Sequence, residues 1–394
     1  MLSPNHRCNV SANVARCSKE TCRARVVTLQ APATELDESM SEKILRVGVL
    51  GCGPISQFAH FESVQKSRNA ALHAVCDADE QLANHFGRFY DAKNIYTDYE
   101  RMLADPAVDA IVIGIADAFH VPAALKALAA GKHVLCEKPI GVAVEEVEEL
   151  EAAVRKSGRI LQVGHMLRFD PGIESAREFI SNRMGQMLAL KAWYCDSTHR
   201  YSMTDAVQPL PRKGKKVLRP AGDPKADKPR YFMLAHGSHL VDLARFLGGP
   251  ISAVQARLHQ RFGAHCWFID VDFESGALGH LDLTIGVRMD WHEGFQVYGE
   301  HGSASAKIYN PWFFKSSDVE LFHEDSATTT RVLGADAHFY RRQLEGFADS
   351  VLLGAPMRGA DIADGLASIR TLVAIAQSVA SGKSVGVASA KGAL

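Results

Sequence analysis

The strongest constraint on this chain is a glycine-containing turn that directly follows an apolar segment. Ile44–Leu50 is mostly aliphatic and β-branched, a composition typical of a buried parallel strand. The residues that follow have the spacing Gly51-x-Gly53-x-x-Ser56, and Pro54 suits the first position of a helix because its missing N–H would be unpaired there anyway. The stretch therefore predicts a strand, a tight turn and a helix.

The same turn has the features of a dinucleotide-binding fingerprint. Gly51 allows the tight turn, Gly53 lets a pyrophosphate approach the backbone, and Ser56 lets the helix and strand pack closely. We expect Pro54 and Ile55, at the start of the helix, to lie beside the phosphates, which free N–H groups there would face. The glycine pattern alone fits an ordinary strand–turn–helix equally well.

An acidic residue at the end of the next strand supports the interpretation of the turn as part of a dinucleotide-binding site. Ala71–Cys76 is the second apolar run, and Asp77 follows it at roughly the ~20-residue distance expected for the acid that holds the adenosine ribose. A carboxylate repels a 2′-phosphate, and no arginine follows it directly. Asp77 therefore favours NAD, with NADP as the alternative.

Apolar strands and amphipathic helices alternate from Ile44 to His165, which predicts an α/β, doubly wound parallel sheet of the Rossmann type. The expected strands are 44–50, 71–77, 95–96, 109–115, 133–136 and 159–164, and the expected helices are 55–67, 79–89, 120–130 and 144–156. We place this NAD(P)-binding domain at residues 43–166.

The pattern changes after Pro171. Helices at 173–182 and 239–247 flank a long irregular stretch, 202–230, that is rich in Lys and Pro. Alternating runs then predict an antiparallel sheet, followed by two closing helices. The expected strands are 252–258, 266–273, 279–285, 294–299 and 303–309, and the helices are 339–352 and 362–380. Residues 167–394 are therefore expected to form a second, α+β domain.

Residues 1–42 are expected to lie outside the fold. The segment up to Arg25 is basic and poor in acids, and it has no apolar core long enough for a signal peptide. Such composition fits a transit peptide, but a disordered tail, or an extension upstream of a true start at Met40, fits better.

The composition and net charge limit the kinds of binding partner that we expect for this chain. The 394 residues suffice for two domains, and the formal net charge of −1 gives no reason to expect nucleic acid. No apolar run approaches the ~20 residues of a membrane span. The eight cysteines are scattered, and Cys52, Cys76 and Cys136 are expected to be reduced core thiols of a cytoplasmic protein. No spaced His/Cys set suggests a metal site.

Several motifs occur in the order of one known family. They are the Gly51–Ser56 turn, Asp77, His120, Glu137-Lys138-Pro139, Arg168-Phe169-x-Pro171, Gly237-Ser238-His239-x-x-Asp242 and Asp364-Gly365. Over residues 44–385 the chain resembles the glucose-fructose oxidoreductase, inositol dehydrogenase and rhizopine catabolism family (Gfo/Idh/MocA). The resemblance implies a Rossmann domain followed by a domain with a largely antiparallel sheet. It also implies hydride transfer between a nicotinamide and a sugar or cyclic polyol hydroxyl, and homodimers or homotetramers.

Lys138 and His239 are the expected catalytic pair. Oxidation of an alcohol needs a base for the hydroxyl proton, and a partly buried lysine near a positive nicotinamide has a lowered pKa that suits this role. Neutral imidazole can take the proton as well, because its pKa lies near physiological pH. Taken alone, each could be an ordinary surface lysine or helix-start histidine. Glu137, beside Lys138, is expected at the cofactor.

The chain departs from the family pattern at two places. The family commonly has Asp four residues before the histidine, where this chain has Ala235 followed by His236. Either His236 compensates, or Lys138 and His239 act alone, or activity is weak or lost. The second departure is Ile115-Ala116-Asp117 before His120, where Thr-Pro-Asn is frequent.

The remaining expected site residues have two readings each. Asp117 and His120 are expected at the cofactor, although His120 could equally be a structural helix-start residue. Arg168 could clamp substrate hydroxyls or form an interdomain ion pair, and Asp242 could share a face with His239 or cap its helix. The leading interpretation is an oxidoreductase. The rival, which Ala235 supports, is a non-catalytic dinucleotide-binding regulator or sensor.

Overall fold

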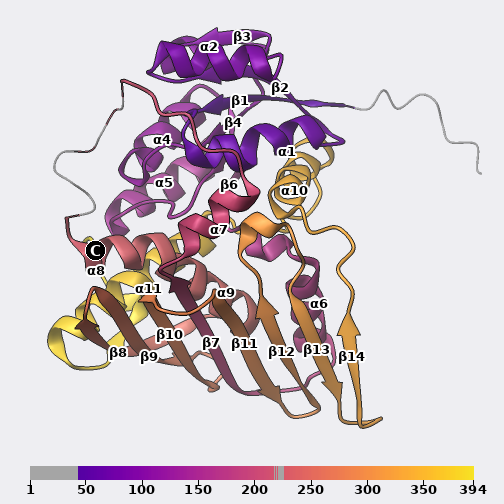
Figure 1. Ribbon diagram of the computed structural model, residues 1–394, viewed down its shortest axis with the longest axis vertical. Helices are drawn as coiled ribbons and strands as arrows, with labels where there is room; N and C mark the ends of the chain where they lie inside the picture. The colour runs from indigo at the N-terminus through magenta and orange to yellow at the C-terminus, as the bar shows by residue number, and fades with distance from the viewer. Residues whose placement is uncertain (1–42, 217, 219, 221–225) are drawn as a thin grey trace, which may run out of the picture. The chain divides into compact units, whose positions relative to one another are not determined.

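Figure 1 shows the computed structural model of the chain, which describes residues 43–216, 218, 220 and 226–394. The expectation for residues 1–42 falls outside the described residues.

The first sheet has six strands in the order β3-β2-β1-β4-β5-β6, and every neighbouring pair is parallel. This order confirms the doubly wound Rossmann fold. The strands are β1 (Leu45–Leu50), β2 (Ala70–Cys76), β3 (Asn94–Tyr96), β4 (Ala110–Ile113), β5 (His133–Cys136) and β6 (Leu161–Val163).

Helices link these strands, with boundaries that local chemistry explains. Asp79 caps α2 by accepting the N–H of Leu82, and Gly158 ends α5 with a φ of 62°, a conformation that favours glycine. The expected helix 55–67 starts at Pro54 but passes through a π-helical turn, η1 (Ser56–His60). The α-helices are α1 (Phe61–Lys66), α2 (Glu80–Phe89), α3 (Tyr99–Leu103), α4 (His120–Ala129) and α5 (Val144–Ser157).

The second sheet has nine strands in the order β14-β13-β12-β11-β7-β10-β9-β8-β15. Only the β7–β10 pair is parallel among its described pairs, so the expected, largely antiparallel character is confirmed. The strands are β7 (Met187–Ser197), β8 (Ile251–Arg261), β9 (Ala264–Phe273), β10 (Leu278–Val287), β11 (His292–Gly299), β12 (Gly302–Ile308), β13 (Asp318–His323), β14 (Thr328–Val332) and β15 (Val385–Gly386).

The structure corrects the sequence analysis in this half. The central strand β7 was missed, because its Ala- and Leu-rich first half lacks the β-branched residues that mark strands. The stretch 202–230 is not wholly irregular, since α7 (Arg200–Val207) covers its start and α8 (Lys228–Phe232) its end. The turn η4 (Met233–Gly237) then leads into α9 (Ser238–Gly248).

Two late helices pack against the N-terminal sheet's helices. α10 (Phe339–Leu353) lies beside α1, and α11 (Ile362–Ser381) packs against α5, α9 and β8 (Figure 1). Contrary to the sequence analysis, α11 has the length and hydropathy that a membrane span needs. However, 61% of that segment is buried inside the protein, as expected for a core helix.

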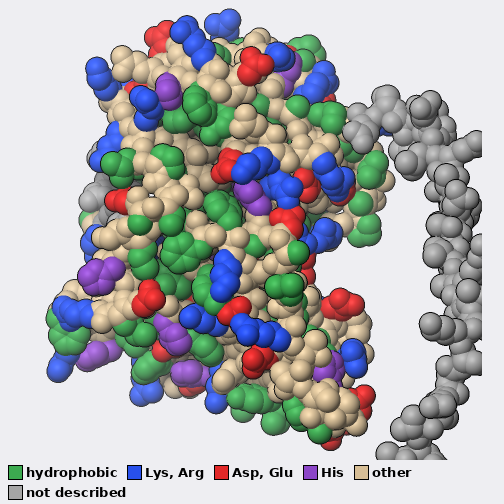
Figure 2. Space-filling view, turned by 45° about the vertical axis from the view of Figure 1, so that its right-hand side comes forward, with side chains coloured by type: hydrophobic (Ala, Val, Ile, Leu, Met, Phe, Trp, Pro, Cys, Tyr) green, Lys and Arg blue, Asp and Glu red, His purple; other side chains and the backbone are tan. Residues whose placement is uncertain are grey.

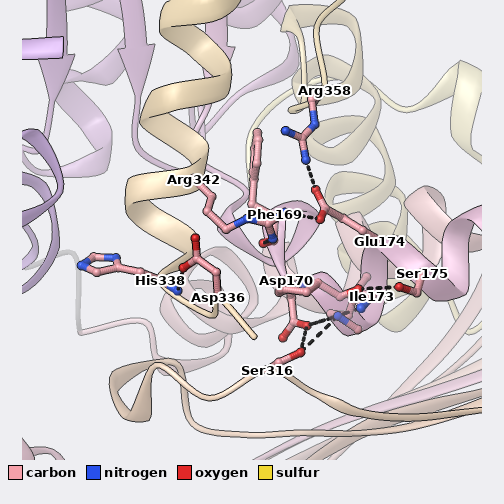
Figure 3. A network of polar contacts seen from close by, with 12 residues as sticks. Phe169, Asp170, Ile173, Glu174, Ser175, Ser316, Asp336, His338, Arg342 and Arg358 are labelled. Atoms are coloured by element: carbon pink, nitrogen blue, oxygen red, sulfur yellow. Dashed lines mark hydrogen bonds and ion pairs between the residues drawn. The ribbon is translucent and has the colours of Figure 1, made fainter. Parts of the chain in front are cut away.

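A polar network fixes the connection from β6 into the second half (Figure 3). Asp170 caps α6 (Pro171–Asn182) by accepting the N–H of Gly172 at 2.8 Å, and it also accepts the hydroxyl of Ser316 at 3.1 Å. Glu174 pairs with Arg342 and Arg358. The short turn η3 (Met166–Phe169), which carries Arg168, is thereby held in place.

The mixed surface charge and the buried cysteines match what the composition predicted. On the face in Figure 2, cationic and anionic side chains of the described residues are interspersed. Cys52, Cys76 and Cys136 are buried free thiols, as predicted, and burial raises the pKa of each, that of Cys76 to about 12.

Candidate active site

The turn after β1 has the backbone shape that a dinucleotide needs. Gly51 has a φ of 94°, and a Cβ there would lie 2.6 Å from Ile115 Cγ2 and 2.7 Å from the Gly114 carbonyl oxygen. Only glycine fits such a position. A Cβ on Gly53 would meet nothing closer than 3.9 Å, so the backbone there is open to an approaching pyrophosphate.

Ser56 packs against the end of β4. A Cβ built on Gly114 would lie 2.6 Å from Ser56 Oγ, so the helix and the strand approach as closely as two small residues permit. A larger residue at either position would push the helix away from the sheet. The turn would then lose its geometry.

The carboxylate of Asp77 lies over the turn. Its Oδ2 accepts the N–H of Cys52 at 2.6 Å, and its Oδ1 accepts the N–H of Asp79 at 2.8 Å. The side chain is half-buried, and each carboxylate oxygen has a second lone pair left. Two ribose hydroxyls could therefore be accepted there. Together with Gly51 and Gly53, this geometry fits NAD.

A basic segment of the second half lies against this turn. The side-chain amide of Gln57 donates to the carbonyls of Cys52 (2.7 Å) and Arg212 (2.9 Å), and its oxygen accepts the N–H of Arg212 at 2.9 Å. Asp79 Oδ2 accepts the N–H groups of Lys215 (2.5 Å) and Lys216 (2.8 Å). We call residues 208–216 the strap. Nothing in the sequence pattern indicated it.

Asp117 lies in the connection after β4, and His120 is the first residue of α4. His120 is 1% exposed, and its ring nitrogens lie 2.7 Å from the Pro139 carbonyl oxygen and 3.1 Å from that of Ile115. The ring therefore ties two sheet-edge loops together, which is the structural reading of this residue. Asp117 is partly exposed, and its carboxylate accepts the N–H of Ala118.

Glu137 is buried and paired inside the protein. Its Oε1 lies 3.1 Å from His60 Nε2, and its side chain is almost fully shielded from solvent. Burial alone would raise the pKa of Glu137, but His60 and the neighbouring Lys138 lower it. The residue thus supplies a fixed negative charge beneath Lys138.

Lys138 reaches from the end of β5 to the second half of the chain. Its Nζ donates a hydrogen bond of 2.9 Å to the carbonyl oxygen of Ala235. Burial, assisted by the nearby Arg200, lowers the pKa of Lys138 to about 8, although Glu137 opposes the shift. At pH 7 only a minor fraction of this amine is therefore unprotonated, but that fraction is far larger than for an ordinary lysine and grows as the pH rises through 8.

His236 and His239 come from η4 and the start of α9. His236 Nδ1 lies 3.2 Å from the hydroxyl of Tyr194, and the His239 ring stacks on the Tyr194 ring at 5.9 Å and 7°. Burial, together with the charge of Lys138, holds the pKa of both histidines well below the usual value. Both imidazoles are therefore neutral proton acceptors at pH 7.

Asp196 and Arg200 complete this cluster, and sequence reasoning missed them. Asp196 Oδ2 lies 3.0 Å from Arg200 Nη1 and 3.7 Å from His236 Nε2. Asp196 belongs to β7, which places Tyr194 and Asp196 on one face of the sheet, and Arg200 is the first residue of α7. If the sequence analysis had recognised β7 as a strand, its alternation would have placed Asp196 on the same face as Tyr194.

Arg168 forms the ion pair that was one of its two expected roles. Its guanidinium donates to Asp242 (2.7 Å) and Asp364 (2.7 Å), and His165 Nδ1 lies 3.6 Å from Asp242. Arg168 and Asp242 are 7% and 2% exposed. Burial alone would raise the pKa of Asp242, but His165 and Arg168 lower it. The guanidinium thus joins η3 to α9 and α11, as the ion-pair interpretation of Arg168 predicts.

The arrangement brings unprotonated or readily deprotonated groups to the carboxyl edge of a parallel sheet with a dinucleotide turn. Among the described residues no group of three or more His, Cys, Asp or Glu side chains has the geometry of a metal site. A lysine and two neutral imidazoles can accept and return a proton. Fold and site together define an NAD(P)-dependent oxidoreductase that combines a Rossmann sheet with a nine-stranded, largely antiparallel C-terminal sheet.

Comparison with known families agrees. Residues 45–165 match the model described as oxidoreductase family, NAD-binding Rossmann fold, and residues 216–305 match the GFO/IDH/MocA C-terminal domain. The chain belongs to the Gfo/Idh/MocA family of oxidoreductases.

Individual relatives are more distant. The chain is 29% identical over 353 residues to inositol 2-dehydrogenase 2 of Saccharopolyspora erythraea, covering 87% of this chain and 95% of the relative. It is 34% identical to the mouse trans-1,2-dihydrobenzene-1,2-diol dehydrogenase, over 41% of this chain and 49% of the relative. A levoglucosan dehydrogenase complex with NADH and levoglucosan has a TM-score of 0.73 at 20% identity, covering 88% and 100% of the two chains.

Proposed function

We propose that the protein is an NAD-dependent dehydrogenase that oxidises a hydroxyl group of a sugar or an inositol-like cyclic polyol. The observation that carries the proposal is the 2.9 Å hydrogen bond from Lys138 Nζ to the Ala235 carbonyl. It brings the amine at the end of β5 beside the turn that carries His236 and the helix that carries His239. These groups belong to separate elements, and only the folded chain brings them together.

The chemistry follows from the protonation states. Bound nicotinamide supplies the hydride acceptor, and the hydroxyl proton must go to a side chain. Lys138, with a pKa of about 8, and His239, with a pKa held well below its usual value, are both able to take it. Lys138 and His239 are thus proposed as the catalytic pair, with His236 next to them.

The cofactor assignment rests on Asp77 and the turn. Gly51, Gly53, Pro54, Ile55 and Ser56 would border the pyrophosphate, and Asp77 would accept the ribose hydroxyls. The negative charge of Asp77 disfavours a 2′-phosphate, so NAD is proposed ahead of NADP.

The experiment is a panel of inositols and aldoses with NAD and with NADP, followed by NADH or NADPH absorbance. We expect turnover with at least one polyol and a lower KM for NAD. Binding of NAD with no turnover on any member would favour the regulator, which the Ala235 departure supports. A Lys138→Ala control should bind NAD but turn over ~10²–10⁴-fold more slowly.

We also propose a cytoplasmic homodimer or homotetramer. The outward face of the nine-stranded sheet exposes apolar side chains, and sheet faces that bury such side chains form stable interfaces. They are Phe268, Leu278, Tyr298 and Phe322. Sedimentation velocity at micromolar concentration tests this, and a monomer would contradict it.

A further inference from the structure

Asp196 is a buried carboxylate with one oxygen unpaired. The residue is 5% exposed, its Oδ1 has no hydrogen-bond partner, and its Oδ2 lies 3.0 Å from Arg200 Nη1. Burying such an oxygen without a partner is costly, so structural stability alone does not account for it.

The Asp196 carboxylate also faces His236, the histidine beside the proposed catalytic pair, through the same Oδ2 that pairs with Arg200. His236 lies between two residues of the same face of β7, with Nδ1 3.2 Å from Tyr194 Oη and Nε2 3.7 Å from Asp196 Oδ2. The latter separation is an ion-pair distance and not a hydrogen bond. A carboxylate there favours a proton on Nε2, which leaves Nδ1 to accept from Tyr194.

The contact between Asp196 and His236 matters because of the residue at position 235. Ala235 carries no side-chain acid, and its carbonyl already accepts from Lys138. Any negative charge near His236 must therefore come from elsewhere. Of the charged groups around it, Lys138 and Arg200 are positive, so both disfavour a proton on His236.

We propose that Asp196 is a positioning residue that supplies, through His236, the carboxylate that position 235 lacks. This role for Asp196 rests on the proposed dehydrogenase function. The hydroxyl proton passes to Lys138 or His239, and from there to His236, as the C–H hydride of the substrate is transferred to the bound nicotinamide. The resulting imidazolium is stabilised by the Asp196 charge, and the proton is then released to water.

The surroundings of Asp196 set its own protonation. Arg200 of α7 favours its charged form, while burial raises the pKa of Asp196 to about 6. Tyr194 and His236 also face it, and Glu293 of β11 lies nearby, where burial raises the pKa of Glu293 well above the usual value and keeps it neutral. Lys138 and His239 complete the charged and titratable groups around His236. Asp196 is therefore mostly a carboxylate at pH 7 and becomes neutral below about 6.

The first test does not need a substrate. The tautomer of the neutral His236 ring is read at pH 7 from its ring nitrogen chemical shifts by NMR, in wild type, Asp196→Asn and the control Asp205→Asn, which removes an exposed acid of α7. We expect wild type to carry the proton on Nε2 and Asp196→Asn to shift toward the Nδ1–H tautomer, because the carboxylate that favours a proton on Nε2 is lost. Asp205→Asn should leave the tautomer unchanged. An unchanged His236 tautomer in Asp196→Asn overturns the proposal, whatever the enzyme assay gives.

The second test uses the turnover of an identified polyol. Asp196→Asn should lower kcat by about 10–10²-fold, at the lower end for proton-transfer groups, with KM and the NAD Kd nearly unchanged. The acid limb of the kcat profile near pH 6 should disappear. Adding Ala235→Asp to Asp196→Asn should restore most of the loss, whereas a merely structural defect would lower Tm and would not be rescued. Wild-type turnover in Asp196→Asn, or no rescue by Ala235→Asp, contradicts the proposal.

Discussion

The ammonium group of Lys138 donates a 2.9 Å hydrogen bond to the main-chain carbonyl of Ala235. The end of β5 and the turn before α9 are thereby joined at the carboxyl edge of the Rossmann sheet, where ligands of such sheets bind. The contact uses the backbone at position 235, so it does not depend on the side chain that differs from the family pattern. The following predictions rest on this geometry.

The first prediction concerns the cofactor. Asp77→Ala should weaken NAD binding and improve the relative use of NADP, because both the ribose acceptor and the negative charge are lost. Asp77→Asn is the matched variant, since its oxygen can still accept the N–H of Cys52 and only the charge is removed. If discrimination is electrostatic, both variants shift the ratio of kcat/KM for the two cofactors. A wild-type preference for NADP would contradict the assignment.

The second prediction concerns the strap. Gln57→Ala removes the two side-chain contacts that hold Arg212 against the turn, so the strap should open more often. Trypsin should then cleave several-fold faster after Arg212, Lys213, Lys215 and Lys216, as followed by mass spectrometry. Gln81→Ala, at an exposed position of α2, is the control. Equal cleavage rates in all three proteins would show that Gln57 does not hold the strap.

The third prediction concerns the buried ion pair. Arg168→Met leaves Asp242 buried without its main partner, which should reduce the free energy of unfolding by about 3–5 kcal/mol. Arg370→Ala removes a more exposed pair with Glu148 and should cost less than about 1 kcal/mol. Denaturant unfolding measures both. If Arg168 instead clamps substrate, Arg168→Met raises KM with stability intact.

The fourth prediction concerns pH. Lys138 accepts a proton only when it is unprotonated, and its pKa of about 8 lies below the usual value. The unprotonated fraction grows as the pH rises through 8, so kcat/KM for alcohol oxidation should increase from about pH 7 to 9 and then level off. Carbonyl reduction should show the opposite trend. Lys138→Arg should remove the limb, because arginine stays charged throughout. A flat wild-type profile over this range would exclude Lys138 as the base.

The sequence was sufficient for the Rossmann half, because its strands are short apolar runs separated by strong turn signals. It also singled out Lys138, His236 and His239, and the fold brings the elements that carry them to one edge of the sheet. It did not identify Asp196, since that required β7, whose first half is Ala- and Leu-rich. The roles of Arg168 and His120 could not be decided either, because the structural and the functional reading of a buried polar residue differ only in its three-dimensional partners.

The most direct test of the account is a double-mutant cycle on an identified polyol with Lys138→Ala, His239→Ala and the double variant. General acid–base groups contribute ~10²–10⁴-fold, so each single variant should lower kcat by about that factor. Because residues acting as a unit are non-additive, the double variant should be little worse than either single one, with the NAD Kd nearly unchanged. Near wild-type turnover in both single variants would contradict the central claim that Lys138 and His239 carry the hydroxyl proton.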